Sequence, residues 1–387
     1  MKLEVATNWD PALIPELKKY PVKEVFGAMD MTPVGSGRPS FVVAKVTKEQ
    51  VKDYVELVHS YNLEFNYLLN GACMGNMEFD RERHLKLLEH IEWLNNIGVD
   101  WVTVTIPYLI EIIKNQFPDI KVKVSTIAHV NSVQRAKFFE ALGVDGITLD
   151  FNINRDFNLL EKIRKAVKCE LTILVNDACL YQCPFRYYHY NLLAHSSQDF
   201  HPLKGFYIDY CIIRCTIAKL SSPAEIIKSR WVRPEDIHLY EEIGIDSFKI
   251  SGRRMSTKWI LNAVRAYSSR RYDGNLFDLL NCITPAVEDE QSPQYRTIME
   301  KTDFLEKEKL LKLSQMFIRA KPYIDNRRLD GFINYFKNQN CLSECENCKY
   351  CEKIANEAIK LDKDHVNAFI EALKNLLDEL VSSKIFR

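Results

Sequence analysis

The stretch 143-GVDGITLDFN-152 joins the end of a helical pattern to a short β-rich run. The same phrase, Gly, an aliphatic residue and Asp before such a run, occurs at 98-GVD-100 and 244-GID-246. Glycine commonly ends a helix in the left-handed conformation, so each phrase predicts a helix stop and a short loop into a strand. The chain is therefore expected to repeat a helix-to-strand unit.

Outward from these phrases, residues 2 to about 252 alternate short β-rich runs with helical patterns. Eight runs can be counted: 2-KLEVATN, 23-KEVFGAM, 63-LEFNYLLNG, 100-DWVTVT, 121-KVKVSTI, 146-GITLDF, 170-ELTILVND and 246-DSFKISG. Eight strands with helices between them predict an α/β fold of the (β/α)8 TIM-barrel type over residues 1–272. An open doubly wound sheet is the alternative, and the absence of G-x-G-x-x-G after the first run disfavours it.

The segment after the seventh predicted strand is the longest connection, and it forms an insertion at about residues 178–240. Connections of that length are uncommon unless they are functional. After about residue 272 the alternation stops, and residues 273–387 are expected to form a C-terminal helical region, with amphipathic patterns at 304–320 and 354–384.

Composition sets broad limits on function. The 387 residues carry 52 basic and 52 acidic side chains, so there is no strong nucleic-acid signal in the net charge. The N-terminus lacks a secretory pattern and no apolar stretch is long enough for a membrane span, so we expect a cytoplasmic protein. In that compartment thiols stay reduced, and clustered cysteines favour metal ligation over disulfides.

Eight of the eleven cysteines fall into two quartets. The first has two Cys-x3-Cys pairs on the long insertion, at Cys179, Cys183, Cys211 and Cys215. A spacing of four places two thiols one helical turn apart, so the pairs can converge on one cofactor. An iron–sulfur cluster fits this pattern, while tetrahedral zinc and buried apolar thiols remain open. Cys73, after the third strand, is a further candidate ligand.

The second quartet is 341-CLSECENCKYC-351, which contains Cys341, Cys345, Cys348 and Cys351. Compact cysteine runs of this kind can wrap an iron–sulfur cluster, and a zinc knuckle is the alternative. The sequence thus favours an iron–sulfur cluster at the first quartet and a second, auxiliary or structural, cluster at this one, with zinc as the alternative at each.

The segment 235-EDIHLYEEIGIDSFKISGRRMSTKWILNAVRAY-267, together with 183-CPFR-186 and the cysteine-bearing insertion, resembles peptidase family U32. The family was named for reported collagen-degrading activity. Several of its members are similar to oxygen-independent hydroxylases of ubiquinone precursors or of pyrimidines in tRNA and rRNA, which hold a [4Fe–4S] cluster on four cysteines. The resemblance implies that Cys179, Cys183, Cys211 and Cys215 are the cluster ligands.

Polar residues at the carboxyl ends of barrel strands are the best catalytic candidates. His129, after the fifth strand, is expected to act as an acid or base. Arg253 and Arg186 could clamp a carboxylate or phosphate. Asp177 follows the seventh strand, and Asp177 or Asp150 could instead pair with Arg253.

The expected function is iron–sulfur redox chemistry on a small cyclic molecule or nucleobase, with an electron donor as partner. A peptidase of the kind in the family name is one alternative, although the sequence has neither H-E-x-x-H nor G-x-S-x-G. An iron–sulfur or zinc scaffold that works with a paralogous partner subunit is another.

Overall fold

The computed structural model describes residues 1–202, 204–205, 207–281, 307–337, 341 and 345–386. The chain divides into two compact units. The barrel unit consists of Met1–Asn176, Arg186–Gly205 and Trp231–Tyr272, and the second unit of Asp177–Phe185, Phe206–Arg230 and Asp273–Arg387. The predicted division into a barrel at residues 1–272 and a helical region at residues 273–387 stays a prediction.

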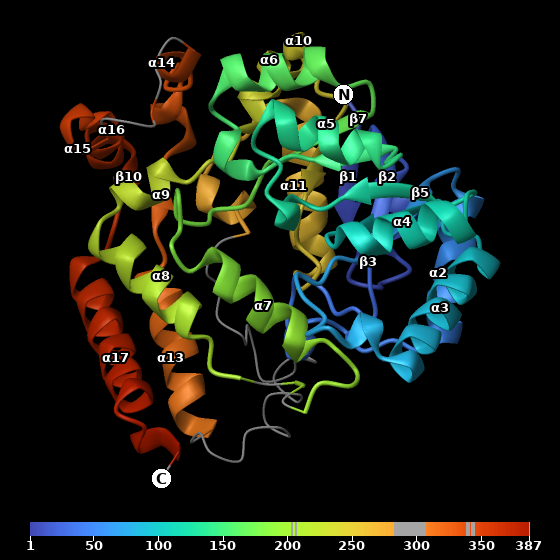
Figure 1. Ribbon diagram of the computed structural model, residues 1–387. Coiled ribbons are helices and arrows are strands. Elements are labelled where there is room, and N and C mark those ends of the chain that lie inside the picture. The colour runs from blue at the N-terminus through green and yellow to red at the C-terminus, as the bar shows by residue number, and fades with distance from the viewer. Residues whose placement is uncertain (203, 206, 282–306, 338–340, 342–344, 387) are drawn as a thin grey trace. The chain divides into compact units, whose positions relative to one another are not determined.

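The barrel unit is built on eight parallel strands that close into a ring in chain order, with β8 pairing back to β1 (Figure 1). The strands are β1 (Leu3–Ala6), β2 (Val22–Gly27), β3 (Glu64–Leu69), β4 (Trp101–Val104), β5 (Lys121–Val124), β6 (Gly146–Thr148), β7 (Glu170–Leu174) and β8 (Ser247–Ile250). This closed ring confirms the predicted TIM barrel, and all eight strands lie within the predicted runs or start one residue before them.

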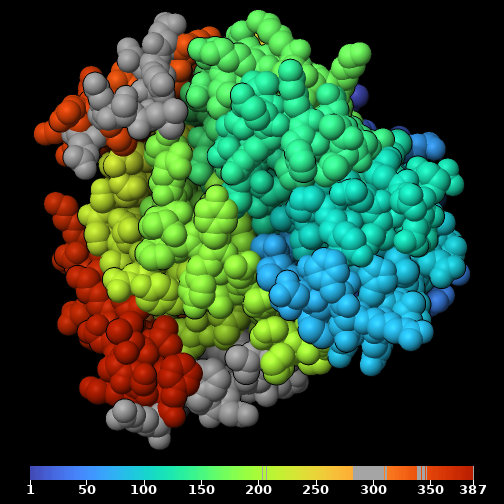
Figure 2. All heavy atoms as spheres, in the orientation of Figure 1, coloured from blue at the N-terminus to red at the C-terminus, as the bar shows by residue number. Residues whose placement is uncertain are grey.

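Helices follow the strands and surround the ring. They are α1 (Leu13–Leu17), α2 (Lys48–Ser60), α3 (Arg81–Asn96), α4 (Pro107–Gln116), α5 (Val133–Ala141), α6 (Phe157–Ala166), α7 (Arg186–Ser196), α10 (Ile237–Ile243) and α11 (Thr257–Ser269). In the space-filling view, blue to green atoms, which belong to the first half of the chain, form the surface of the barrel unit on the side shown (Figure 2). None of the helices in the described part of the chain has the length and hydropathy that a membrane crossing requires.

The repeated Gly-x-Asp phrase has two structural roles. Gly98, Gly143 and Gly244 have φ of 76°, 84° and 92°, the left-handed conformation expected where a helix ends. The aspartate two residues later accepts a hydrogen bond from a backbone N–H near the start of the preceding strand. These bonds are Phe65 to Asp100 at 2.7 Å, Val122 to Asp145 at 2.8 Å and Leu171 to Asp246 at 2.8 Å. The phrase therefore ties β3 to β4, β5 to β6 and β7 to β8.

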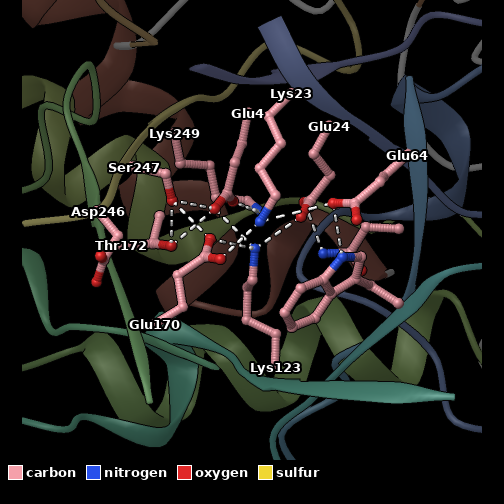
Figure 3. Close-up of polar contacts among 12 residues, drawn as sticks. Glu4, Lys23, Glu24, Glu64, Lys123, Glu170, Thr172, Asp246, Ser247 and Lys249 are labelled. Atoms are coloured by element: carbon pink, nitrogen blue, oxygen red, sulfur yellow. Dashed lines mark hydrogen bonds and ion pairs between the residues drawn. The ribbon is translucent and has the colours of Figure 1, made fainter. Parts of the chain in front are cut away.

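Charged side chains fill part of the barrel interior (Figure 3). Lys123 Nζ lies 2.7 Å from a carboxylate oxygen of Glu4 and 2.7 Å from one of Glu24, and all three side chains are fully buried. Lys249 reaches the other Glu4 oxygen at 3.2 Å, and Asn66 donates to Glu24 at 2.7 Å. Each buried charge thus has an opposite charge or a hydrogen-bond partner, as burial requires.

The second unit is mainly helical. Its elements are α8 (Tyr210–Ser221), α9 (Ala224–Lys228), α13 (Lys307–Ala320), β9 (Tyr323–Ile324), α14 (Asn334–Lys337), α15 (Cys345–Cys348), α16 (Tyr350–Ala358), β10 (Ile359–Lys360) and α17 (Lys363–Val381). α17 packs against α13 and α8, and α16 packs against α9. The amphipathic pattern at 354–384 is interrupted where β10 pairs antiparallel with β9 and Asp362 caps α17.

Candidate functional site

The barrel unit gathers its candidate side chains beyond the carboxyl ends of the strands. His129 follows β5 and the 3-10 turn Thr126–Ala128, while Asp150 follows β6 and caps the 3-10 turn Phe151–Ile153. Arg186 begins α7, and Arg253 follows β8. This is the end at which TIM barrels place their chemistry.

Asp150 is the centre of a buried group. Arg186 Nη1 donates to both of its carboxylate oxygens, at 2.8 and 3.0 Å. His129 Nδ1 lies 3.5 Å from Asp150 Oδ2. Burial alone would raise the pKa of Asp150, but His129 and Arg186 hold it below its ordinary value. The carboxylate therefore stays ionised and orients both the imidazole and the guanidinium.

The Arg186 guanidinium has N–H groups that do not bind Asp150. Its guanidinium lies 4.0 Å above the ring of Phe151 and its side chain is 6% exposed. Among the residues that the structure describes, Nε and Nη2 of Arg186 are buried without a hydrogen-bond partner. A buried N–H left unpaired costs about 1–3 kcal/mol, so these two donors are suited to an anion that enters the site.

Arg253 is the second buried cation of the barrel unit. It donates one hydrogen bond, to Ser36 Oγ at 3.4 Å, and within the described chain its Nη1 has no partner. Burial and the charge of Arg38 lower the pKa of Arg253 to about 9. Asp150 pairs with Arg186 and not with Arg253, so the guanidinium of Arg253 is available to a ligand.

His129 is held in an uncommon conformation. Its φ of 54° lies in the left-handed region, which a residue other than glycine adopts at a cost of about 1–3 kcal/mol and which often marks functional sites. The ring is 7% exposed and lies 4.6 Å from Tyr187 and 5.7 Å from Tyr190 of α7, between ring centroids. Tyr187 is 67% exposed, so one aromatic wall of the group faces solvent.

The first cysteine quartet lies wholly within the second unit. Cys179 and Cys183 flank a turn in which Gln182 is left-handed, and α8 carries Cys211 and Cys215 one turn apart. Burial, Asp209 and the thiols of Cys183 and Cys215 raise the pKa of Cys211 to about 12. The charge of Cys215 also contributes to the raised pKa of Cys179.

Two further groups complete the surroundings of this quartet. Asp177 accepts a hydrogen bond from the Cys179 backbone at 3.0 Å, so it belongs with the cysteines in the second unit. Burial and Asp177 raise the pKa of the Cys179 thiol, and Lys219 opposes them. Lys219 is buried and follows Cys211 and Cys215 at intervals of four on α8, which places all three on one helix face. The sequence spacing could have identified Lys219, but we did not predict it.

The second quartet lines a cavity of about 470 Å3, whose walls also include Tyr181, Lys228, Arg230 and Tyr335. The Tyr335 hydroxyl lies 3.0 Å from Cys348 Sγ. That contact and the nearby thiols of Cys341 and Cys351 raise the pKa of Tyr335 to about 12. The structure therefore brings the four cysteines of this quartet together around one space.

None of the ten described cysteines forms a disulfide, and Cys282 lies outside the described residues. Among the described residues, no three Cys, His, Asp or Glu side chains are grouped so that they could hold a metal ion. Cys73 belongs to the barrel unit, where its carbonyl accepts a hydrogen bond from Gln198 at 2.6 Å.

Three comparisons relate the chain to known proteins. The model of peptidase family U32 matches residues 38–275. The uncharacterized protease MJ1657 of Methanocaldococcus jannaschii is 35% identical over 332 residues, which cover 85% of this chain and 86% of that protein. The solved structure of the U32 peptidase Mk0906 is 22% identical with a TM-score of 0.49, covering 65% of this chain and 92% of that one. The family match and the identity to MJ1657 show that the chain belongs to peptidase family U32.

Proposed function

We propose that the chain is an iron–sulfur-dependent redox enzyme that acts on a small anionic substrate bound in the barrel unit. Oxygen-independent hydroxylation of a ring or nucleobase is the reaction we favour. The observation that carries the proposal is that Cys179, Cys183, Cys211 and Cys215 all belong to one unit, with Cys211 and Cys215 one turn apart on α8.

The residues around the first quartet suit a cluster. Thiolates are the usual ligands of iron–sulfur clusters, and a cluster with four thiolates is an anion. The buried ammonium of Lys219, on the same helix face as Cys211 and Cys215, offsets that charge. A bound cluster would supply one-electron redox chemistry. In the motif 183-CPFR-186, Arg186 follows Cys183 by three residues in the sequence.

The substrate is expected to carry a carboxylate or phosphate. Nε and Nη2 of Arg186 are parallel donors of one guanidinium, which matches the two oxygens of such a group. Arg253 Nη1 adds a third buried donor from the barrel unit. The rings of Tyr187 and Tyr190 beside His129 offer faces on which a planar substrate can stack.

His129 is the proton carrier of this proposal. Its Nδ1 faces Asp150, which fixes the ring and favours a proton on that nitrogen. Nε2 is then the atom that accepts a proton from the substrate and releases it afterwards. Asp150 acts as a positioning residue, because its carboxylate also holds the Arg186 guanidinium in place.

Anaerobic purification followed by iron and sulfide analysis tests the proposal. We expect a brown protein that loses iron and colour from the first quartet in Cys179→Ala and Cys211→Ala. The matched control is Cys169→Ala, since Cys169 lies in the barrel unit outside both quartets, and it should keep its iron. A colourless protein that contains zinc and no sulfide would contradict the proposal.

The names of the family and of MJ1657 favour a second candidate, a peptidase. Cleavage of a peptide panel that persists after iron is removed would support it. A scaffold working with a paralogous partner subunit predicts instead that the cluster assembles, while Arg186→Gln and His129→Gln leave the activity of the assembled complex unchanged.

A further inference from the structure

The cavity around the second quartet has the size of a ligand site. Its volume of about 470 Å3 lies within the range of roughly 300–1,000 Å3 typical of small-molecule and cofactor pockets. Cys341, Cys345, Cys348 and Cys351 all contribute to its wall. Every lining residue belongs to the second unit, so this cavity is complete within it.

The placement of the thiols fits a polynuclear cluster better than a single ion. A tetrahedral zinc with Zn–S bonds of about 2.3 Å needs its four thiolates within roughly 4 Å of one another. All four cysteines border one cavity of about 470 Å3, so their thiols are distributed around a space. In a cluster each thiolate binds a different iron, so the ligands stand around a space rather than at one point.

Positive charge and hydrogen bonding on the cavity wall suit an anionic cluster. Lys228 and Arg230 both line the cavity, and the Arg230 guanidinium lies 3.8 Å from the ring of Tyr181. The Tyr335 hydroxyl lies 3.0 Å from Cys348 Sγ, and its ring stacks on Tyr350 with centroids 3.9 Å apart. Hydrogen bonds to sulfur and nearby charge are the means by which proteins set cluster potentials.

Two segments connect this cavity to the first quartet. Tyr181 lies on the cavity wall and is two residues from both Cys179 and Cys183, so its Cα is within about 7 Å of theirs. Helix α8 carries Cys211 and Cys215 and ends at Ser221, which also lines the cavity. Two short segments of one unit therefore connect the first quartet to the cavity of the second.

We propose that Cys341, Cys345, Cys348 and Cys351 bind a second iron–sulfur cluster, which carries single electrons between the first quartet's cluster and a redox protein. The electron-transfer role rests on the proposed function, whereas the binding site does not. With water as the oxygen source, hydroxylation of a C–H bond (R–H + H2O → R–OH + 2 H+ + 2 e−) releases two electrons. They reduce the first cluster one at a time, and each electron then oxidises the first cluster and reduces the second as it moves between them. The second cluster returns to its starting state by passing that electron to an acceptor of the ferredoxin or flavodoxin class. Cys345 and Cys348 are exposed, so this cluster is accessible to such a partner.

Iron counting on the full chain, reconstituted anaerobically with iron and sulfide, tests the site. We expect about eight iron atoms per wild-type chain and about four in the double variant Cys345→Ala/Cys348→Ala. The Cys179→Ala/Cys211→Ala variant should also keep about four, now in the second quartet. The inference is overturned if the wild type contains about four iron atoms per chain and Cys345→Ala/Cys348→Ala contains the same number. It is also overturned if the wild type contains one zinc ion that this variant lacks. If iron is lost in Cys345→Ala/Cys348→Ala but not in Cys179→Ala/Cys211→Ala, the first quartet holds no cluster. The proposed function is then wrong, while the second-quartet site stands.

Tyr335→Phe provides a test that does not depend on removing a ligand. It keeps the ring stack on Tyr350 and removes only the hydroxyl beside Cys348. We expect an unchanged iron content and a lower reduction potential for one of the two EPR-detected clusters, because a hydrogen bond to sulfur stabilises the reduced state. EPR of the fully reduced wild type should also show magnetic interaction between two clusters. Unchanged potentials in Tyr335→Phe and no magnetic interaction would contradict the electron-transfer role.

Discussion

Replacing Lys123 by methionine removes the central cation of the barrel interior without a large change in side-chain volume. The Lys123 ammonium lies 2.7 Å from Glu4 and 2.7 Å from Glu24, and none of the three side chains is exposed (Figure 3). Lys249 then remains as a cation beside Glu4, at 3.2 Å, while Glu24 keeps the hydrogen bond from Asn66. The variant therefore leaves at least one buried carboxylate without an adjacent charge.

Loss of one partner from a buried ion pair typically costs about 3–5 kcal/mol, because the remaining charge is desolvated and uncompensated. We expect Lys123→Met to lower the free energy of unfolding by that amount. Adding Glu24→Gln should recover part of it, since the neutral amide is close in shape to the carboxylate and can still accept from Asn66.

Urea denaturation at neutral pH measures these differences. The matched control is Lys114→Met, which breaks the 3.0 Å pair with Asp145 at a partly exposed position and should cost about 1 kcal/mol or less. A loss below about 1 kcal/mol in Lys123→Met, or no recovery when Glu24→Gln is added, would refute the view that this buried charge pairing stabilises the barrel.

Three further predictions concern single aspartates and an arginine. Asp246→Ala should lower the free energy of unfolding by about 1–3 kcal/mol, because the buried end of β7 loses the acceptor of its Leu171 N–H, and thermal melting will show it. Asp150→Asn should lower the free energy of unfolding by about 3 kcal/mol or more at neutral pH, because Arg186 loses its buried counter-charge. Because the folded-state pKa of Asp150 is lowered, the wild type loses this stabilisation as the pH falls below 3.8, so the difference between the two proteins should shrink there. Equal differences at pH 3 and pH 7 in urea titrations would contradict this. Arg186→Lys should weaken substrate binding at least tenfold in steady-state assays with little loss of iron, because one ammonium cannot donate in parallel to both oxygens.

The fold was largely predictable because its signals are local. Alternating β-rich runs and helical patterns, separated by glycine stops, require only the residues within each element, and the eight strands closed as expected. The role of Asp145 in binding the Val122 N–H depends on a partner 23 residues away, so the phrase itself did not reveal it. The charged interior was not predicted at all, since Glu4 and Lys123 are 119 residues apart.

The candidate site was predictable as a list of residues but not as groups. His129 and Arg186 were expected beyond the barrel strands, and the structure joins them through Asp150. Asp177 was expected to serve the same site; the structure shows it accepting a hydrogen bond from the Cys179 backbone, and its catalytic role stays a prediction. Spacing along the chain places residues on one helix face or one loop, but it cannot tell which unit of a discontinuous domain a loop will join.

The barrel unit contains buried charges that are paired with one another and buried cations with donors unpaired among the described residues. This contrast supports a ligand site at the second group. In the interior, Glu4 and Lys123 satisfy each other, so burial is stable without any ligand. Beyond the carboxyl ends of the strands, Arg186 and Arg253 keep buried donors that no described residue accepts from. Such donors lower stability, and a barrel built only for stability would not retain them. An anion that binds these two guanidinium groups would accept from the unpaired donors and remove the energetic cost of burying them. The chemistry of Arg186 and Arg253 is therefore the starting point for identifying the substrate.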